Sequence, residues 1–218
     1  MKFALYNYNG QPIKYYYSRV DTLSSDDQET TSLPSHLIII VDCSGSMYNI
    51  LSNVKSSIKG LFNSSEFQKS NLHISLLSYA SNKDVKVHFS KTPIAQIDAK
   101  MSEVDKLKTR GLTCMSQGLE KALTLVDSKE LTAITIHSDG YANHSSSSSE
   151  RNKIEQFIQK AKRKKNLFVH AIAHTNYSDF STLSKIANSL SGRCISIKNR
   201  GSDGTKKMEN LLTSTGLD

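Results

Sequence analysis

Three oxygen-bearing side chains follow the most apolar stretch of this 218-residue sequence. Residues 36–42 read His-Leu-Ile-Ile-Ile-Val-Asp, and a run of branched apolar residues without polar alternation predicts a strand buried on both faces. Asp42, Ser44 and Ser46 come at its end. In an open parallel sheet, ligands bind outside the carboxyl ends of the strands. We therefore expect the chemistry of this protein at that end.

The residue types of this segment indicate which ligand it would take. A carboxylate and two hydroxyls are hard oxygen donors, which suit Mg2+, Mn2+ or Ca2+ and suit zinc or copper poorly. Gly45 would allow a tight turn between the two serines. The same residues also fit a helix N-cap, because serine and aspartate before an apolar-periodic segment commonly accept hydrogen bonds from free amide groups. The motif Asp-x-Ser-x-Ser alone does not decide between a site and a cap.

Two further oxygen donors occur later in the sequence. Thr113 lies in a glycine-containing turn before a predicted helix, and Asp139 follows a second strand-like run. With these two residues the chain resembles the von Willebrand factor A (vWA) family, whose metal-ion-dependent adhesion site (MIDAS) has the pattern Asp-x-Ser-x-Ser, then Thr, then Asp. The matching positions, in the family's order, are Asp42, Ser44, Ser46, Thr113 and Asp139. Similarity of element order runs from about residue 36 to the C-terminal region.

The resemblance implies a function as well as a fold. It implies that Ser44, Ser46 and Thr113 bind a metal ion directly, while Asp42 and Asp139 either coordinate it or act through water. One coordination position stays open for a Glu or Asp of a protein partner. Intracellular bacterial members of the family often act as adaptors of AAA-type ATPases, so we expect a partner of that class. The prediction is a non-catalytic interaction module that depends on Mg2+, Mn2+ or Ca2+.

The order of the predicted elements indicates an α/β fold with a doubly wound, mostly parallel sheet and helices on both faces. Helical spacing of apolar residues predicts helices at 47–62, from 115 onward, at 154–161, at 183–190 and near 208–212. Strands are expected at 36–42, 72–79, 132–138, 167–173 and 194–197, with 85–89 as an antiparallel edge strand. The strand at 36–42 should lie in the middle, between 72–79 and 132–138. Residues 92–109 predict a short helix or an irregular crossover, and the serine run 145–149 a mobile loop.

The N-terminal part differs in composition from the rest. Residues 1–20 predict a tyrosine-rich β-hairpin, because strand-like segments flank Asn9 and Gly10. Residues 21–35 are polar, acidic and serine-rich, which is typical of a linker. We expect the vWA domain to occupy 36–218.

Composition limits the classes of protein that fit. Three scattered cysteines argue against a disulfide scaffold and favour a reducing compartment, so we expect a cytoplasmic protein. The first residues lack the apolar core of a signal peptide, and no run reaches membrane-spanning length. The formal net charge of +8 is concentrated at 151–165. A nucleic-acid-binding face is therefore an alternative, although a solvated lysine-rich helix explains the same charges.

A metal-dependent phosphotransferase or phosphatase with Asp42 as nucleophile is the third candidate. Phosphotransferases of the haloacid dehalogenase type carry a second Asp two residues after the first, where this chain has Ser44. The Gly-x-Ser-x-Gly and P-loop patterns are also absent, so we do not expect an enzyme.

Cys43 and Cys114 flank site positions and are interpreted as buried thiols rather than a redox pair. His174 is expected to be a hydrogen-bonded structural residue near the rim.

Overall fold

The computed structural model describes residues 2–8, 11–17, 33–140, 147–174, 178–197 and 202–213. The chain divides into two compact units, Met1–Thr30 and Thr31–Asp218. The first contains strands β1 (Lys2–Tyr8) and β2 (Gln11–Tyr17), which pair antiparallel as the predicted hairpin. Most of the predicted linker 21–35 lies outside the described residues, and the proposed domain boundaries stay a prediction.

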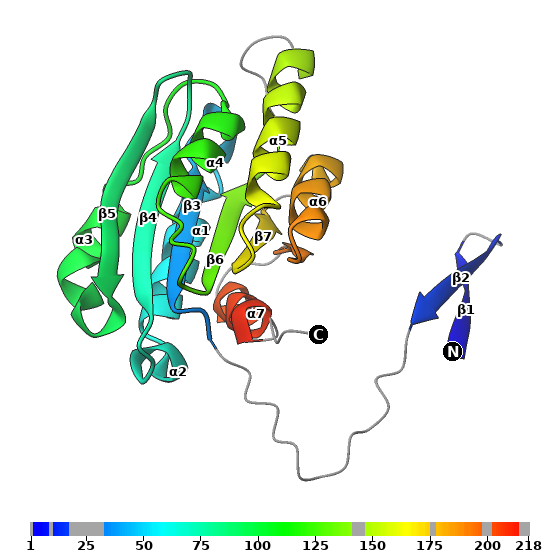
Figure 1. Cartoon of the computed structure of the whole chain (residues 1–218), viewed down its shortest axis with the longest axis horizontal. Coiled ribbons are helices and arrows are strands. Elements are labelled where there is room, and N and C mark those ends of the chain that lie inside the picture. Colours follow the sequence, from blue (N-terminus) through cyan, green and yellow to red (C-terminus); the bar gives the residue numbers. More distant parts are fainter. Residues whose placement is uncertain are drawn as a thin grey trace. The chain divides into compact units, whose positions relative to one another are not determined.

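The second unit contains a six-stranded sheet with the order β5-β4-β3-β6-β7-β8 (Figure 1). Its strands are β3 (His36–Asp42), β4 (His73–Tyr79), β5 (Val85–Pro93), β6 (Thr132–Ser138), β7 (Leu167–Ala173) and β8 (Cys194–Ser196). β5 runs antiparallel to β4, and every other neighbouring pair is parallel. The predicted fold class, the central place of β3 and the antiparallel edge strand are confirmed.

Helices connect the strands across both faces of this sheet. They are η1 (Gly45–Met47), α1 (Leu51–Phe62), α2 (Ser65–Gln68), η2 (Ile94–Lys100), α3 (Met101–Asp105), α4 (Met115–Leu123), α5 (Ser147–Ala161), α6 (Phe180–Ser189) and α7 (Ser202–Thr213). Both η helices are of the 3-10 type. In the described part of the chain, no helix combines the length and the apolar composition needed to cross a membrane.

Two predicted segments need correction. The first helix begins at Leu51 rather than at 47, because Gly45–Met47 form a 3-10 turn and residues 48–50 turn again before the regular helix. The serine run 145–149 is not entirely a loop, since residues 147–149 open α5, and 145–146 lie outside the described residues. Serine is a favourable residue type where a helix begins, which explains why a serine-rich segment ends as a helix.

The side chains of β3 alternate between two apolar layers, one on each face of the sheet. Leu37, Ile39 and Val41 pack in a cluster with residues of α1, η2 and α7, while Ile38 and Ile40 pack in a cluster with α4, α5 and α6. All five are fully buried, and burying an aliphatic side chain of this size stabilises the fold by about 1.5–3 kcal/mol. A one-residue slip of β3 would exchange its two faces, so this burial fixes its register.

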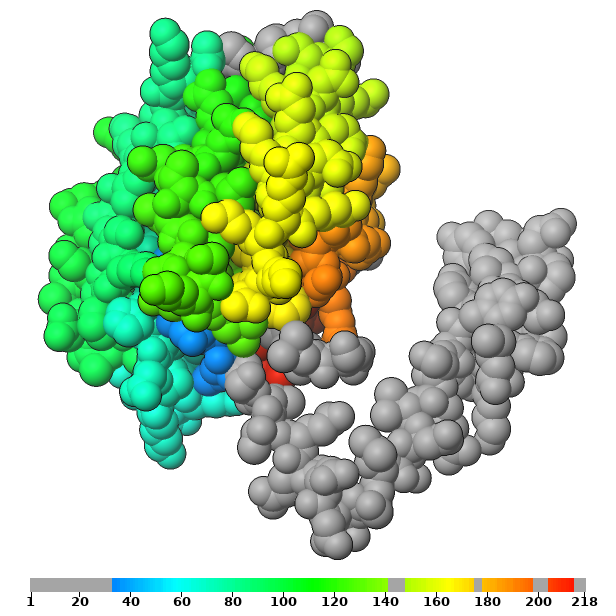
Figure 2. All heavy atoms as spheres, viewed as in Figure 1, coloured from blue at the N-terminus to red at the C-terminus, as the bar shows by residue number. Residues whose placement is uncertain are grey.

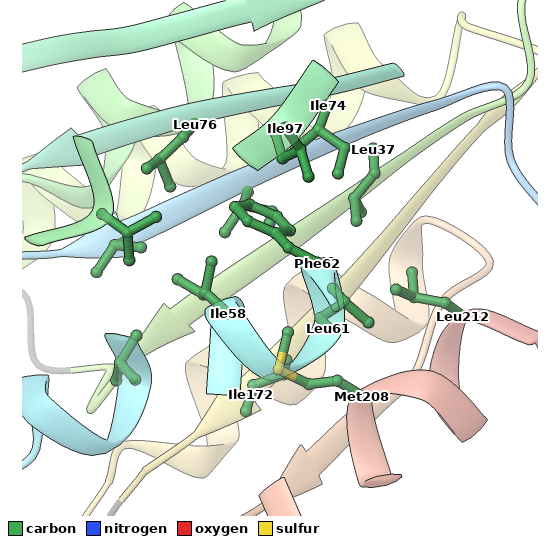
Figure 3. Close-up of a cluster of buried hydrophobic side chains, with 14 of the residues drawn as sticks. Leu37, Ile58, Leu61, Phe62, Ile74, Leu76, Ile97, Ile172, Met208 and Leu212 are labelled. Carbon is green, nitrogen blue, oxygen red and sulfur yellow. The ribbon is translucent and has the colours of Figure 1, made fainter. Parts of the chain in front are cut away.

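The figures show the two layers. In the close-up, Leu61 and Phe62 of α1 lie in the same cluster as Leu37 of β3 and Met208 and Leu212 of α7 (Figure 3). The opposite face of the sheet is covered by α4 and α5, which lie side by side (Figures 1 and 2). Because both faces are covered, access to β3 is left at its ends.

His36 and His170 are two of the three histidines in this sheet that have no exposed surface, and the third, His137, lies next to the end of β6. The Nε2 atom of His36 is 2.8 Å from the hydroxyl oxygen of Ser75, and the Nδ1 atom of His170 accepts a hydrogen bond from the Arg193 amide at 3.1 Å. Burial lowers the pKa of each ring to about 4, with smaller contributions from the charges of Lys91 and Arg193 respectively. Both imidazoles are therefore neutral in the folded protein at pH 7.

These histidines predict how stability changes with pH. As pH falls from 6.5 toward 4, His170 becomes protonated in the unfolded chain but stays neutral in the folded chain. The free energy of unfolding therefore decreases. The His170→Gln variant should lose up to about 3 kcal/mol less than the parent over this interval. Urea unfolding at several pH values measures the difference. Substitution of the exposed His73 by Gln serves as the control, and equal slopes for parent and His170→Gln would contradict the assignment.

Candidate metal site

Two loops that carry predicted site residues are joined by backbone hydrogen bonds at the carboxyl end of β3. The amide of Arg110 donates to the carbonyl of Cys43 at 2.6 Å, and the amide of Gly45 donates to the carbonyl of Gly111 at 3.1 Å. The amide of Cys114 donates to the carbonyl of Ala80, beyond the end of β4, at 2.7 Å. These bonds hold the segment that contains Thr113 against the segment that contains the two serines.

The two serine hydroxyls lie side by side. The Oγ atoms of Ser44 and Ser46 are 3.0 Å apart, and Ser44 is buried while Ser46 is exposed. Ser44 precedes η1, but its side chain makes no capping hydrogen bond, and no side chain caps α1. The N-cap interpretation of this motif is therefore wrong, and Ser46 marks the side of the site that faces solvent.

The Asp42 carboxylate is fully buried and is held by three donors. Its Oδ1 atom accepts from the Ser44 amide at 2.8 Å, and its Oδ2 atom accepts from the Ser138 hydroxyl at 2.7 Å and from the Tyr79 hydroxyl at 3.2 Å. These donors come from the loop after β3 and from the ends of β6 and β4. The carboxylate therefore ties together the three central strands of the sheet.

Asp139 places a second carboxyl group near the first. It is 3% exposed, and its backbone carbonyl accepts a hydrogen bond from the Asp179 amide at 2.7 Å. Burial raises the pKa of Asp42 to about 6, hydrogen bonds from Ser138 and Ser44 oppose this rise, and the charge of Asp139 adds to it. No lysine or arginine within the described residues lies at ion-pair distance from the Asp42 carboxylate. The arrangement favours a nearby cation.

The donor set fits a hard divalent ion. Among the described residues, no group of three or more His, Cys, Asp or Glu side chains could hold a metal. Any metal at this position would therefore depend on hydroxyl oxygens, and the candidates for these are Ser44, Ser46 and Thr113, on the two loops that are joined by backbone hydrogen bonds. Neutral oxygen ligands with few carboxylates suit Mg2+, Mn2+ or Ca2+. Thr113 itself is fully buried, in the loop that is bonded to the Ser44 segment.

The backbone turns of the site depend on different glycines from the one expected. Gly45 has no left-handed backbone, and a Cβ there would meet the Gly111 carbonyl oxygen at an ordinary 3.6 Å. Gly111 has φ +60° and a Cβ there would lie 2.0 Å from the hydroxyl of Ser81, while Gly140 has φ +80°. The turns that require glycine are therefore those beside Thr113 and Asp139.

A buried glutamate fixes the start of α4, directly after Thr113. Glu150 in the first turn of α5 has no exposed surface and accepts hydrogen bonds from the Ser116 amide at 2.7 Å and from the Ser116 hydroxyl at 3.0 Å. The Cys114 thiol lies 3.7 Å from the same carboxylate. A negative charge at a helix N-terminus is favourable, since it meets free amide groups and the positive end of the dipole.

The family model described as "von Willebrand factor type A domain" matches residues 36–210, from β3 into α7. The chain belongs to the von Willebrand factor A family. The match covers more than half of the 218 residues and includes all five positions of the MIDAS pattern. The comparison with curated protein sequences gave no match.

Solved structures share the vWA fold at low sequence identity. A von Willebrand factor type A protein from Catenulispora acidiphila superposes with a TM-score of 0.69 at 17% identity, covering 84% of this chain and 43% of that one. BatB from Bacteroides thetaiotaomicron superposes with a TM-score of 0.63 at 16% identity, covering 83% of this chain and 98% of that one. Proximal thread matrix protein 1 from the mussel byssus was solved with a zinc-occupied MIDAS motif. It superposes with a TM-score of 0.63 at 19% identity, covering 84% of this chain and 46% of that one. This vWA domain spans less than half of the first and third of these chains.

Several residues of this vWA site were not assigned a role from the sequence. Ser138 and Tyr79 are donors to Asp42, and the signal for Tyr79 was its position, because it pairs with Asp42 in the parallel register of β3 and β4. Arg110 anchors the Thr113 loop, since its Nε atom donates to the Asp84 carboxylate at 2.7 Å and its guanidinium to the Ser78 hydroxyl at 3.1 Å. Glu150 carried no local signal.

The thiols and histidines near the vWA site are structural. Cys43 and Cys114 are buried free thiols, and burial raises the pKa of each. His137 and His174 are stacked, with Nδ1 of the first 3.0 Å from Nε2 of the second. Burial lowers the pKa of both rings, that of His174 to about 4. The predictions of buried thiols and of a hydrogen-bonded His174 are confirmed.

The contact between Ser138 and Asp42 predicts an effect on metal binding. Ser138→Ala removes the shortest hydrogen bond to the Asp42 carboxylate, and loss of a residue that orients a ligand typically weakens metal affinity about 10–100-fold. Calorimetric titration of Mn2+ into the parent and the variant measures the change. The control is Ser56→Ala on the exposed side of α1, which should bind as the parent does. Unchanged affinity in Ser138→Ala would show that Asp42 does not depend on this contact.

The buried position of Glu150 predicts a loss of stability. Glu150→Gln keeps one carbonyl acceptor but replaces a carboxylate oxygen by an amide donor and removes the charge at the start of α4. The free energy of unfolding should fall by about 1–3 kcal/mol. Urea unfolding of Glu155→Gln provides the control, because that partly exposed residue in the same helix pairs with Lys185 at the surface and should change stability by less than about 1 kcal/mol. Equal effects of the two substitutions would refute the role of Glu150.

Proposed function

We propose that this vWA domain is a metal-dependent interaction module that binds an acidic side chain of a protein partner through a divalent cation. The observation that carries the proposal is the enclosure of Asp42. Three of the roughly four hydrogen-bond positions of its carboxylate are filled by protein donors. In this proposal Asp42 acts mainly through water, and the hydroxyls of Ser44, Ser46 and Thr113 are direct ligands.

This division of roles determines what the site can attract. A cation held mostly by neutral hydroxyls keeps more of its positive charge than one held by several carboxylates, so an incoming carboxylate gains more from binding it. Ser46 is the exposed member of the set, and we therefore place the incoming Asp or Glu on its side. When bound, Mg2+, the proposed ion, would supply the charge that recognises the partner.

The enclosure of Asp42 also argues against an enzyme. A nucleophile must reach the substrate in line, and a carboxylate with no exposed surface whose oxygens are occupied by donors does not offer that approach. We therefore propose that the domain is not catalytic.

The nucleic-acid alternative has weaker support. It rests on the basic residues of segment 151–165, which runs from α5 into the turn that follows it, yet Lys160 in that segment already pairs with Glu120 at 3.1 Å. A steep loss of affinity with salt and no dependence on metal would favour it. The cytoplasmic location and the AAA-type ATPase as partner are proposals that rest on cysteine usage and on the family resemblance.

Metal titration tests the proposed function directly. Asp42→Ala and Ser44→Ala should each weaken Mn2+ or Mg2+ binding at least about tenfold, because each removes a member of the donor set. Isothermal titration calorimetry gives the affinities, and circular dichroism checks that the fold persists. Ser56→Ala again serves as the matched control among the serines.

The choice of metal is part of the same experiment. Zn2+ belongs in the series because the mussel protein was solved with zinc at its MIDAS motif. Binding of Mg2+ or Mn2+ that both substitutions weaken supports the proposal. If neither ion binds, or if both substitutions leave the affinity unchanged, the site is not a MIDAS and the proposed function fails.

A further inference from the structure

Exposed apolar side chains gather around the candidate metal site. Four large hydrophobic residues are strongly exposed in the described part of the second unit: Tyr48 at 75%, Leu112 at 50%, Phe180 at 46% and Val87 at 40%. Single exposed hydrophobic residues are ordinary in soluble proteins, but concentration on one surface indicates an interaction site. Tyr48 and Leu112 lie on loops that follow the carboxyl ends of the parallel strands, Phe180 is the first residue of α6, and Val87 lies in the edge strand β5.

Each of the first three is one step from the site. Tyr48 directly follows η1, which begins between the two serines. Leu112 is the neighbour of Thr113. Phe180 follows Asp179, whose amide donates to the carbonyl of Asp139. We call Tyr48, Leu112 and Phe180 the apolar rim. Tyr48 and Leu112 lie within the segments of the MIDAS pattern, and Phe180 follows a residue that is bonded to the third segment.

The backbone of the rim is held in place. The Tyr48 amide donates to the Gly45 carbonyl at 3.2 Å, the Leu112 amide to the Ser81 hydroxyl at 2.9 Å, and the Phe180 amide to the Ser178 carbonyl at 2.7 Å. These side chains are therefore presented on ordered backbone while remaining in water. Preorganised contacts of this kind reduce the entropy lost when a partner binds.

Charges at the same edge are complementary to an acidic partner. Lys83 in the β4–β5 turn, Lys108 before the Thr113 loop, and Arg151 and Lys153 in the first turns of α5 are exposed. The turn between β4 and β5 and the start of α5 lie at the same end of the sheet (Figure 1). Asp84, the acidic residue of that turn, is paired with Arg110. Exposed cations and apolar side chains are therefore found at the same end of the sheet as the two buried carboxylates.

We propose that this edge binds a peptide segment of a partner protein in which one Asp or Glu is flanked by apolar residues. The acid occupies the open position of the metal site, and the flanking side chains cover the apolar rim. This inference rests on the proposed function and adds the sequence chemistry of the ligand to it.

Fluorescein-labelled nonapeptides test the inference in fluorescence anisotropy with the full chain and Mg2+. One probe has the sequence Gly-Ser-Leu-Phe-Asp-Leu-Phe-Ser-Gly. In the second, serine and glycine replace the four apolar residues, and in the third asparagine replaces the aspartate. The first should bind at least about tenfold more tightly than either of the others, and EDTA should abolish its binding. Covering one half-exposed apolar side chain corresponds to roughly a tenfold change in affinity.

Variants of the rim locate the contact. Tyr48→Ser, Leu112→Ser and Phe180→Ser should each weaken the first peptide about 5–20-fold and leave Mn2+ affinity unchanged. Val87→Ser is the control, because it removes an exposed apolar side chain of the edge strand β5 that does not belong to the rim, and it should bind as the parent does.

The outcomes separate the two proposals. Metal-dependent binding of both aspartate peptides with equal affinity leaves the proposed function standing and overturns the rim. Failure to bind any of the peptides also overturns the rim, while Mn2+ titration reports on the site independently. Equal binding of the asparagine peptide, or binding that persists in EDTA, contradicts the acidic ligand itself.

Two other occupants of the rim are covered by parallel measurements. Metal-independent sedimentation of the protein with vesicles of phosphatidylcholine and phosphatidylserine, lost in the rim variants, would assign the surface to a membrane and overturn the peptide proposal. Mg2+-dependent dimerisation in analytical ultracentrifugation, lost in Asp42→Ala, would assign it to a second copy of this chain.

Discussion

A buried negative charge at the end of the central strand is the constraint on which the site depends. Removing a carboxylate from water costs several kcal/mol unless donors replace the lost hydration. Asp42 finds its donors in its own loop, at the end of β4 and at the end of β6. Because β3 lies between those two strands, the strand order brings to the Asp42 carboxylate the hydrogen-bond donors that offset the cost of its burial.

The same constraint explains why the surrounding residues are small or hydroxylated. The Ser44 amide and the hydroxyls of Ser138 and Tyr79 donate to the Asp42 carboxylate without adding a positive charge, and burial still raises the pKa of Asp42 to about 6. A lysine in place of one of these donors would neutralise the charge and remove the attraction for a metal. Structural neighbours at 16–19% identity share the fold, and a function must be argued from this local chemistry.

Sequence reasoning predicted the features that repeat along the chain. The apolar runs of β3, β4, β6 and β7 and the spacing of the helices follow from periodicity, and the five MIDAS positions from a pattern with fixed residue types. It failed where distant segments decide the outcome. Tyr79 looks like an ordinary strand residue, and Glu150 looks like a solvated acid of a basic helix, until the fold brings them to Asp42 and to the start of α4. The start of α1 was misplaced because a 3-10 turn keeps apolar residues at nearly helical spacing.

The junction between Asp139 and α6 has a mechanical consequence. The Asp179 amide is bonded to the carbonyl of Asp139, and a Cβ added at Gly140 would lie 2.7 Å from the Asp179 carbonyl oxygen, so there is no slack between the two backbones. Asp179 also caps α6 through the Thr182 amide. A force applied to the first turn of α6 would therefore be transmitted through covalent and hydrogen bonds to the peptide group of Asp139. In this way the surface of the domain is mechanically coupled to its buried acidic site.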